Sequence, residues 1–309
     1  MDKADDSSRQ VSKWANLHRD ILVIIFYKLD VRDLTMGASR VCITWFLASH
    51  DKTLWNTVDL AKFRQVDGES LSLRNFLNKI IKFFDIHETR RNLTNITKLS
   101  RSTPKNLFFD YDAYIEEEDL MFAAERMPNI EKLVLPRWSF QTKNSYQFAF
   151  SQWKNLETLI IANDSSLTGK LGFQEVGENC SNLINLKYMG DFEKNTAENI
   201  VRYLKNIKRL SLRCSSISHL GVLLLIRGLK NLAILNLSHC RESEWDHIRN
   251  LEMVTIGNLE QAATQKQVIF LGCSLNLNNC RVCKERPYCR FWPYGIKNWR
   301  NDEIKEFEF

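Results

Sequence analysis

The sequence lacks any long hydrophobic run. Its longest apolar stretches, Ile21–Phe26 and Gly221–Ile226, are far shorter than the roughly 20 residues that a helix needs to cross a bilayer. Residues 1–10 are polar and acidic and contain no apolar core of a secretory signal. The eight cysteines are scattered over 309 residues and not packed into a short disulfide-bonded domain. We therefore expect the chain to act in a reducing compartment, the nucleus or the cytoplasm.

The sequence also lacks the common signatures of catalysis. It contains no Gly-rich phosphate loop and no nucleophile elbow, and its six histidines form no metal-binding pair at helical spacing. A RING-type ligase needs several paired Cys and His ligands, whereas only one Cys-x-x-Cys occurs here. The neighbours His239 and Cys240 would point to opposite faces of a strand. We expect no catalytic residue and no cofactor.

Charge of one sign is not concentrated overall. The formal charge is +6, from 43 Lys and Arg against 37 Asp and Glu, and we interpret most of this charge as a solvated surface. The composition therefore does not predict a nucleic-acid partner, and the absence of a spanning segment predicts no membrane partner.

What the first sixty residues do contain is apolar side chains at helical spacing. Leu17, Ile21, Leu22, Ile25, Phe26 and Leu29 fall on one helical face, with Val23 and Ile24 beside it. Asp30 and Asp33 resemble a capping box that starts a second helix, and a third short element follows at Leu54 and Trp55. That second helix would carry Leu34, Ala38, Val41, Cys42, Trp45 and Phe46.

Three short helices bury too little surface to cover this many large side chains. The apolar excess predicts either a surface for a partner or packing against the rest of the chain.

The order of these residues resembles the F-box motif over about forty-five positions. The matching runs are Leu17–Leu22, Ile25–Leu29, Asp33-Leu34, Arg40–Cys42, Trp45 and Leu54–Asn56. Two positions depart from the family pattern, because His18 stands in place of Pro and Ile43 in place of Lys or Arg. The resemblance implies that this segment docks a Skp-family adaptor through Leu17, Ile21, Leu22, Ile25, Phe26, Leu34, Val41, Cys42, Trp45, Leu54 and Trp55.

The second half of the chain repeats itself about every twenty-six residues. Asn followed by Ile or Leu recurs at residues 129, 155, 182, 206 and 231, in steps of 26, 27, 24 and 25. Apolar residues three and five positions later complete a Leu-x-x-Leu-x-Leu pattern, which looks like a leucine-rich repeat. A further, degenerate unit is expected at Leu107 and Phe109.

The alternation within each repeat predicts a short strand, and helices are expected between the strands at 116–127, 145–153, 196–204 and 219–229. We therefore expect an α+β architecture, with a three-helix F-box followed by an irregular αβ solenoid of about six repeats. The expected boundaries are a disordered 1–13, an F-box at 14–60, a helical linker and cap at 61–104, repeats at 105–275 and a C-terminal cap at 276–309.

In the linker, an apolar stripe is expected to form the capping helix. Its members are Leu73, Phe76, Leu77, Ile80, Ile81 and Phe84.

From residue 14 to nearly the end, the chain resembles plant F-box/leucine-rich-repeat proteins. The runs that carry this likeness include Ala123–Asn129, Leu210–Cys214 and Asn236–Cys240. The resemblance implies a substrate-recognition subunit of a Skp-cullin-F-box ubiquitin ligase. Such a subunit binds the adaptor, and through it a cullin, with the F-box and a target protein with the repeats. A small-molecule receptor of the same family, or a repeat scaffold that works without the ligase, are the alternatives.

Two smaller features remain. Basic residues expected on the concave side of the repeats are candidates for binding an acidic target, namely Lys132, Lys187, Lys208, Arg209 and Arg213. Scattered surface charge is the other interpretation of these residues. Cys280, Cys283 and Cys289, with Cys273 as a fourth ligand, could form a zinc site, although half of the usual ligand pattern is missing. Small buried residues that close the end of the solenoid are the other interpretation of these cysteines.

Overall fold

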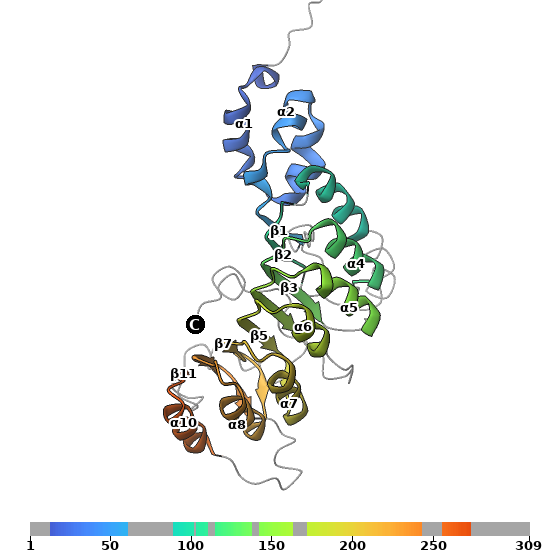
Figure 1. The fold of residues 1–309 in the computed structure, drawn as a ribbon. Coiled ribbons are helices and arrows are strands. Elements are labelled where there is room, and N and C mark those ends of the chain that lie inside the picture. Colours follow the sequence, from blue (N-terminus) through green and yellow to red (C-terminus); the bar gives the residue numbers. More distant parts are fainter. Residues whose placement is uncertain are drawn as a thin grey trace, which may run out of the picture.

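The protein is described here from a computed structural model. The structure describes residues 13–60, 89–101, 103–110, 115–137, 142–162, 172–242 and 255–272. Short helices gather at one end of the molecule, and beyond them parallel strands follow one another with helices along one side (Figure 1). The predicted capping stripe at 73–84 and the cysteines at 273, 280, 283 and 289 lie outside the described residues.

The N-terminal segment forms short helices that end in a strand. They are η1 (Lys13–Asn16), α1 (Arg19–Phe26), η2 (Asp33–Gly37), η3 (Ala38–Arg40), α2 (Ile43–Ala48) and η4 (Lys52–Trp55). Strand β1 (Thr57–Asp59) follows, inside the segment predicted to be an F-box. The predicted module therefore contributes a strand to the sheet of the second half.

The helix expected from Asp30 onward is divided into pieces. Asp30 caps its start as predicted, since its carboxylate accepts a hydrogen bond from the Asp33 N–H at 2.8 Å. Two hydroxyls then donate to backbone carbonyls four residues earlier, Thr35 to Val31 and Ser39 to Thr35. Such bonds compete with the backbone ladder and bend helices. The chain passes through the π-helical η2 and the 3-10 helix η3 before α2 begins.

The central feature is an eight-stranded parallel sheet in the order β1-β2-β3-β4-β5-β7-β9-β11. Neighbouring strands of the sheet follow one another along the chain, which is compatible with the predicted solenoid. Two of these strands, β1 and β11, were not predicted. The other strands of this sheet are β2 (Asn106–Phe108), β3 (Lys132–Arg137), β4 (Thr158–Ala162), β5 (Asn185–Met189), β7 (Arg209–Ser211), β9 (Ile234–Asn236) and β11 (Ile269–Leu271).

The register of the sheet places the repeated leucines side by side. Leu133 is paired with Leu159, Leu159 with Leu186, and Leu186 with Leu210, which is next to Leu235. All five are fully buried. Because side chains alternate along a strand, the predicted Leu-x-x-Leu-x-Leu pattern lines the core side of every repeat.

Helices connect the strands and lie along one side of the sheet (Figure 1). The four predicted helices are present to within two residues at each end, as α4 (Glu117–Arg126), α5 (Lys143–Gln152), α7 (Lys194–Tyr203) and α8 (His219–Gly228). A helix over residues 89–100 lies in the predicted linker. Two further helices, α6 (Phe173–Asn179) and α10 (Ile256–Gln265), were not predicted.

Polar side chains tie each repeat to the one before it. The repeated asparagines donate to carbonyls of the preceding repeat, Asn182 to Lys154, Asn206 to Ser181 and Asn231 to Lys205, over 2.9 to 3.3 Å. At the other end of the strands, Cys240 donates to the Leu212 carbonyl and Ser215 to the Tyr188 carbonyl. Ser215 therefore makes the hydrogen bond that Asn or Cys makes after the strand in the usual leucine-rich repeat.

A second, three-stranded parallel sheet lies beyond the main one. It has the order β10-β8-β6 and consists of β6 (Asp191–Phe192), β8 (Ser216–Ile217) and β10 (Arg241–Glu242). The hydrophobic core is one continuous cluster that extends from Leu22 in α1 to Val268 before β11. None of the described helices is long and apolar enough to span a membrane.

Candidate functional site

The first helix of the candidate site begins at the position where the F-box pattern usually has proline. His18 is the N-cap of α1, with φ −58°, a value that proline itself adopts. Its Nδ1 accepts a hydrogen bond from the Asp20 N–H at 3.4 Å. The helix start is therefore kept despite the departure, because histidine supplies both the backbone angle and a weak side-chain cap.

The inner side of this segment is a small core. Leu22, Phe26, Leu34 and Trp55 are buried, and the Trp45 ring meets the Phe26 ring edge-on with 5.3 Å between centroids. Leu17, Ile25 and Leu54 pack partly buried against this core. These residues form the core that holds the short helices together.

The outer side of the same segment is apolar and exposed. Of the eleven large hydrophobic residues that are exposed in the described part of the chain, nine lie between residues 14 and 47. We name these nine residues the N-terminal apolar surface. They are Trp14, Ile21, Ile24, Tyr27, Met36, Val41, Ile43, Phe46 and Leu47.

This surface includes two helical stripes. Ile21 and Ile24 are three residues apart on α1, and Ile43, Phe46 and Leu47 occupy successive turns of α2. In both helices they face away from the buried positions Leu22, Phe26 and Ala48. Large apolar side chains gathered on the outside of one segment are a mark of a partner surface.

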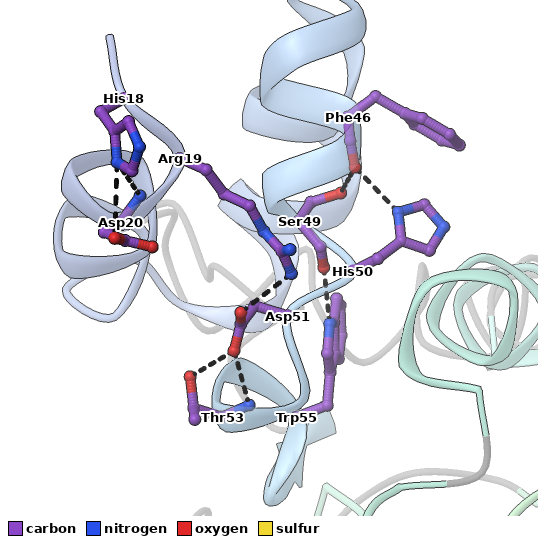
Figure 2. Close-up of polar contacts among 9 residues, drawn as sticks. All are labelled: His18, Arg19, Asp20, Phe46, Ser49, His50, Asp51, Thr53 and Trp55. Carbon is purple, nitrogen blue, oxygen red and sulfur yellow. Dashed lines mark hydrogen bonds and ion pairs between the residues drawn. The ribbon is translucent and has the colours of Figure 1, made fainter.

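Polar contacts link α1, α2 and η4 within this segment (Figure 2). The Asp51 carboxylate caps η4 by accepting from the Thr53 hydroxyl at 2.8 Å and from its N–H at 3.1 Å. It also accepts from Arg19 Nη2 of α1 at 3.0 Å. The Thr53 hydroxyl bond and, to a lesser extent, the Arg19 charge lower the pKa of Asp51 below its ordinary value. The buried Trp55 indole N–H donates to the Ser49 carbonyl at 2.7 Å.

The predicted adaptor-binding residues thus divide into two groups. Most are core or partly buried, with Cys42 among the half-buried ones, whereas Ile21 and Val41 are exposed, by 47% and 59%. Sequence reasoning missed the two most exposed aliphatic members of this surface, Ile24 at 63% and Ile43 at 70% exposure. A signal was present for both, because each is an aliphatic residue at a helical position that the predicted core did not need.

The five basic residues predicted on the repeats do not lie together on an open surface. Lys187 is almost fully buried, and Lys132, Arg209 and Arg213 are half-buried. Burial and then the charge of Lys187 lower the pKa of Lys132 to about 8, which indicates that these two lysines are near each other. Lys208 is exposed and directly precedes β7. Because side chains alternate along a strand, it points away from the face on which the other four basic residues lie.

The described residues contain no cluster of three or more potential metal ligands. Cys240 and Cys180 are buried, and burial raises the pKa of the Cys180 thiol to about 12. Such a thiol remains protonated and is a poor nucleophile.

Comparison with known proteins identifies the class. F-box protein At4g11580 of Arabidopsis thaliana is 48% identical, over the full length of both chains. F-box/LRR-repeat protein At3g48880 of the same plant is 32% identical over 96% of each chain. F-box/LRR-repeat protein 22, also of Arabidopsis thaliana, is 22% identical and covers 74% of this chain and 70% of its own. No protein-family model matches the sequence.

Proteins that carry an F-box together with leucine-rich repeats form one class. This chain belongs to the plant F-box/leucine-rich-repeat family, because the similarity extends over the whole chain at 48% and over nearly all of it at 32% identity.

Proposed function

We propose that this chain is the substrate-recognition subunit of a Skp-cullin-F-box ubiquitin ligase, acting in the nucleus or cytoplasm. In this proposal a Skp-family adaptor, and through it a cullin, binds the N-terminal apolar surface, and the repeats bind the target protein. The single observation that carries the proposal is the gathering of exposed hydrophobic residues between residues 14 and 47. Family membership agrees with it.

The proposed mechanism requires no reacting side chain in this protein. Holding a target and a loaded conjugating enzyme in one assembly raises the effective concentration of the target lysine near the reacting thioester. This chain would contribute a fixed arrangement of its adaptor-binding and target-binding surfaces. Strand β1 joins the F-box segment directly to the repeat sheet through its pairing with β2, and the continuous core ties both parts together.

Co-expression with a plant Skp-family adaptor tests the proposal. Wild-type protein is expected to co-purify with the adaptor at a 1:1 ratio. An Ile24→Asp/Ile43→Asp variant changes only exposed side chains, so it should fold and lose at least about ten-fold in affinity, since each buried apolar side chain contributes about 1.5–3 kcal/mol.

The matched control is Phe148→Asp/Ile269→Asp, which replaces the two large exposed hydrophobic residues that the described part of the chain has outside this segment, at 39% and 58% exposure. This control should bind the adaptor as the wild type does. Equal loss in both variants, or no binding by folded wild-type protein, would contradict the proposal and favour a scaffold that works without the ligase.

A further inference from the structure

The charge of the repeats changes sharply along the chain. From residue 199 to residue 241 the sequence contains eight Lys or Arg and no Asp or Glu, although the whole chain carries a net charge of only +6. This stretch begins within α7 and ends at β10. The earlier repeats are different, with four consecutive acidic residues at the start of α4 alone, 116–119.

Five of these cations are exposed at one end of two neighbouring repeats. We name them the basic rim: Arg202, Lys205, Lys208, Arg227 and Lys230. Arg202 and Arg227 lie in the last turns of α7 and α8, and the three lysines lie between those helices and the strands β7 and β9. Within the described residues, none of the five has an acidic side chain within ion-pair distance.

Contacts between the two repeats place the cations next to one another. The Asn231 amide beside Lys230 donates to the Lys205 carbonyl at 3.2 Å. The Lys208 carbonyl likewise accepts the N–H groups of Ala233 and Ile234 in the next repeat. Near Arg227, a Cβ added at Gly228 would meet Val201 Cγ1 at 2.5 Å. The ends of α7 and α8 are therefore in direct contact, and they lie side by side in Figure 1.

The helix dipole explains only part of this set. Cations in the last turn of a helix favour the helix dipole, which accounts for Arg202 and Arg227 but not for the lysines that follow. Backbone bonds from one repeat to the next connect a row of equivalent positions that contains Lys208, and its members in earlier repeats are Lys105, Glu131, Glu157 and Ile184. The repeat therefore does not require a cation at this position. Like charges gathered at neighbouring positions repel each other, so an anionic partner would relieve that repulsion.

We propose that the basic rim binds an acidic segment of a partner protein, a run rich in Asp and Glu. The inference rests on the proposed function in one respect, since it identifies the chemistry by which the repeats would recognise a target. An extended segment places alternate side chains about 7 Å apart, a spacing that long, flexible lysines on two neighbouring repeats can meet. Three of the five cations are lysines, whose ammonium groups are compact point charges on flexible stems. Such groups can reach carboxylates without a fixed bidentate geometry.

Fluorescence anisotropy of the full chain with a labelled peptide of alternating Glu and Ser tests this proposal. The acidic peptide is expected to bind, and its affinity should fall with added salt. It should also bind more tightly than the matching peptide of Gln and Ser. A Lys205→Glu/Lys230→Glu variant should weaken binding by about ten-fold, because it converts two favourable surface contacts into repulsive ones.

Lys154→Glu is the matched control. Its carbonyl accepts the repeat asparagine Asn182, as that of Lys205 accepts Asn231, but it lies outside the basic rim. This variant should bind within about two-fold of the wild type. The proposal is overturned if the neutral peptide binds equally, if Lys154→Glu is equally damaging, or if labelled single-stranded RNA binds more tightly than the acidic peptide.

The adaptor pull-down with the same proteins separates the two proposals. Retained adaptor binding without peptide binding removes only the acidic-segment inference. Peptide binding without adaptor binding supports the basic rim and removes the ligase assignment.

Discussion

Asp119 shows how one side chain can work against the fold around it. Its carboxyl lies at the start of α4 with only 4% of the side chain exposed, 3.6 Å from the guanidinium of Arg90, and its Oδ2 has no hydrogen-bond partner. Burial raises the pKa of Asp119 to about 6, against the opposing effect of Arg90. The folded state therefore holds the proton more tightly than the unfolded chain does.

Asp119→Asn is expected to stabilise the protein at pH 7.5. Because the folded pKa lies above the unfolded value of 3.8, stability falls as pH rises from about 4 to about 6 and stays low above that. The neutral amide removes this penalty, on the order of 2 kcal/mol. Thermal unfolding of both proteins at pH 5 and pH 7.5 checks this prediction, and the stability difference in favour of the variant should grow with pH. A loss of stability that is the same at both pH values would mean that Asp119 is an ionised partner of Arg90.

At the scale of elements, close approach between helices depends on single glycines. A Cβ on Gly177 in α6 would lie 2.2 Å from the Tyr203 carbonyl oxygen at the end of α7. That neighbour is backbone, so it cannot move aside by changing a rotamer. Gly257 in α10 offers the opposite case, because its added Cβ would meet only the Thr255 hydroxyl, at 3.7 Å.

Gly177→Ala is therefore expected to destabilise the protein by about 1–3 kcal/mol through overpacking. Gly257→Ala is its matched control and should stabilise by up to about 1 kcal/mol, since alanine favours helix more than glycine does. Chemical denaturation of both variants measures the difference. Equal, small effects would indicate that α6 and α7 do not approach as closely as described.

The elements themselves were predictable where periodicity was strong. The repeated Asn-Leu pattern located β3, β4, β5, β7 and β9, because alternation with a buried face leaves little choice of register. The degenerate unit expected at Leu107 and Phe109 located β2. It missed β1 and β11, whose sequences lack the complete repeat pattern and become strands through pairing with β2 and β9. The division of the second N-terminal helix was also missed, since side-chain bonds from Thr35 and Ser39 compete with a helix that the apolar spacing favours.

At the scale of the whole molecule, the N-terminal helices and the strands and helices that follow them share one hydrophobic core. Trp55 lies at the junction, fully buried and two residues before β1. Because no separate core divides the two parts, we expect them to unfold together.

Trp55→Ala should reduce the free energy of unfolding by about 3–5 kcal/mol and so lower the melting temperature of the entire chain. It should do so in one transition seen alike by circular dichroism and by tryptophan fluorescence. Trp14→Ala is the matched control, because that side chain is 61% exposed, and its effect should be within about 0.5 kcal/mol. Two separate transitions, with only one shifted by the Trp55 change, would show that the parts fold independently.

The candidate site was only partly accessible from the sequence. The motif order located the segment and its core, including Leu22, Phe26 and Trp55, because burial of large apolar residues follows from their spacing. It could not separate residues that hold the helices together from those that face outward. Ile24 and Ile43 have the same hydrophobicity as buried isoleucines, and their exposure depends on how α1 and α2 pack.

By itself, the sequence determined the repeat period, the leucine face of the sheet and the family, since each depends on local order along the chain. Only packing decided which apolar residues remain exposed, that β1 joins the repeat sheet, and which cations of two neighbouring repeats come together at the basic rim. Those properties depend on distances between residues far apart in the chain, for example between Lys205 and Lys230, and a linear pattern does not contain such distances.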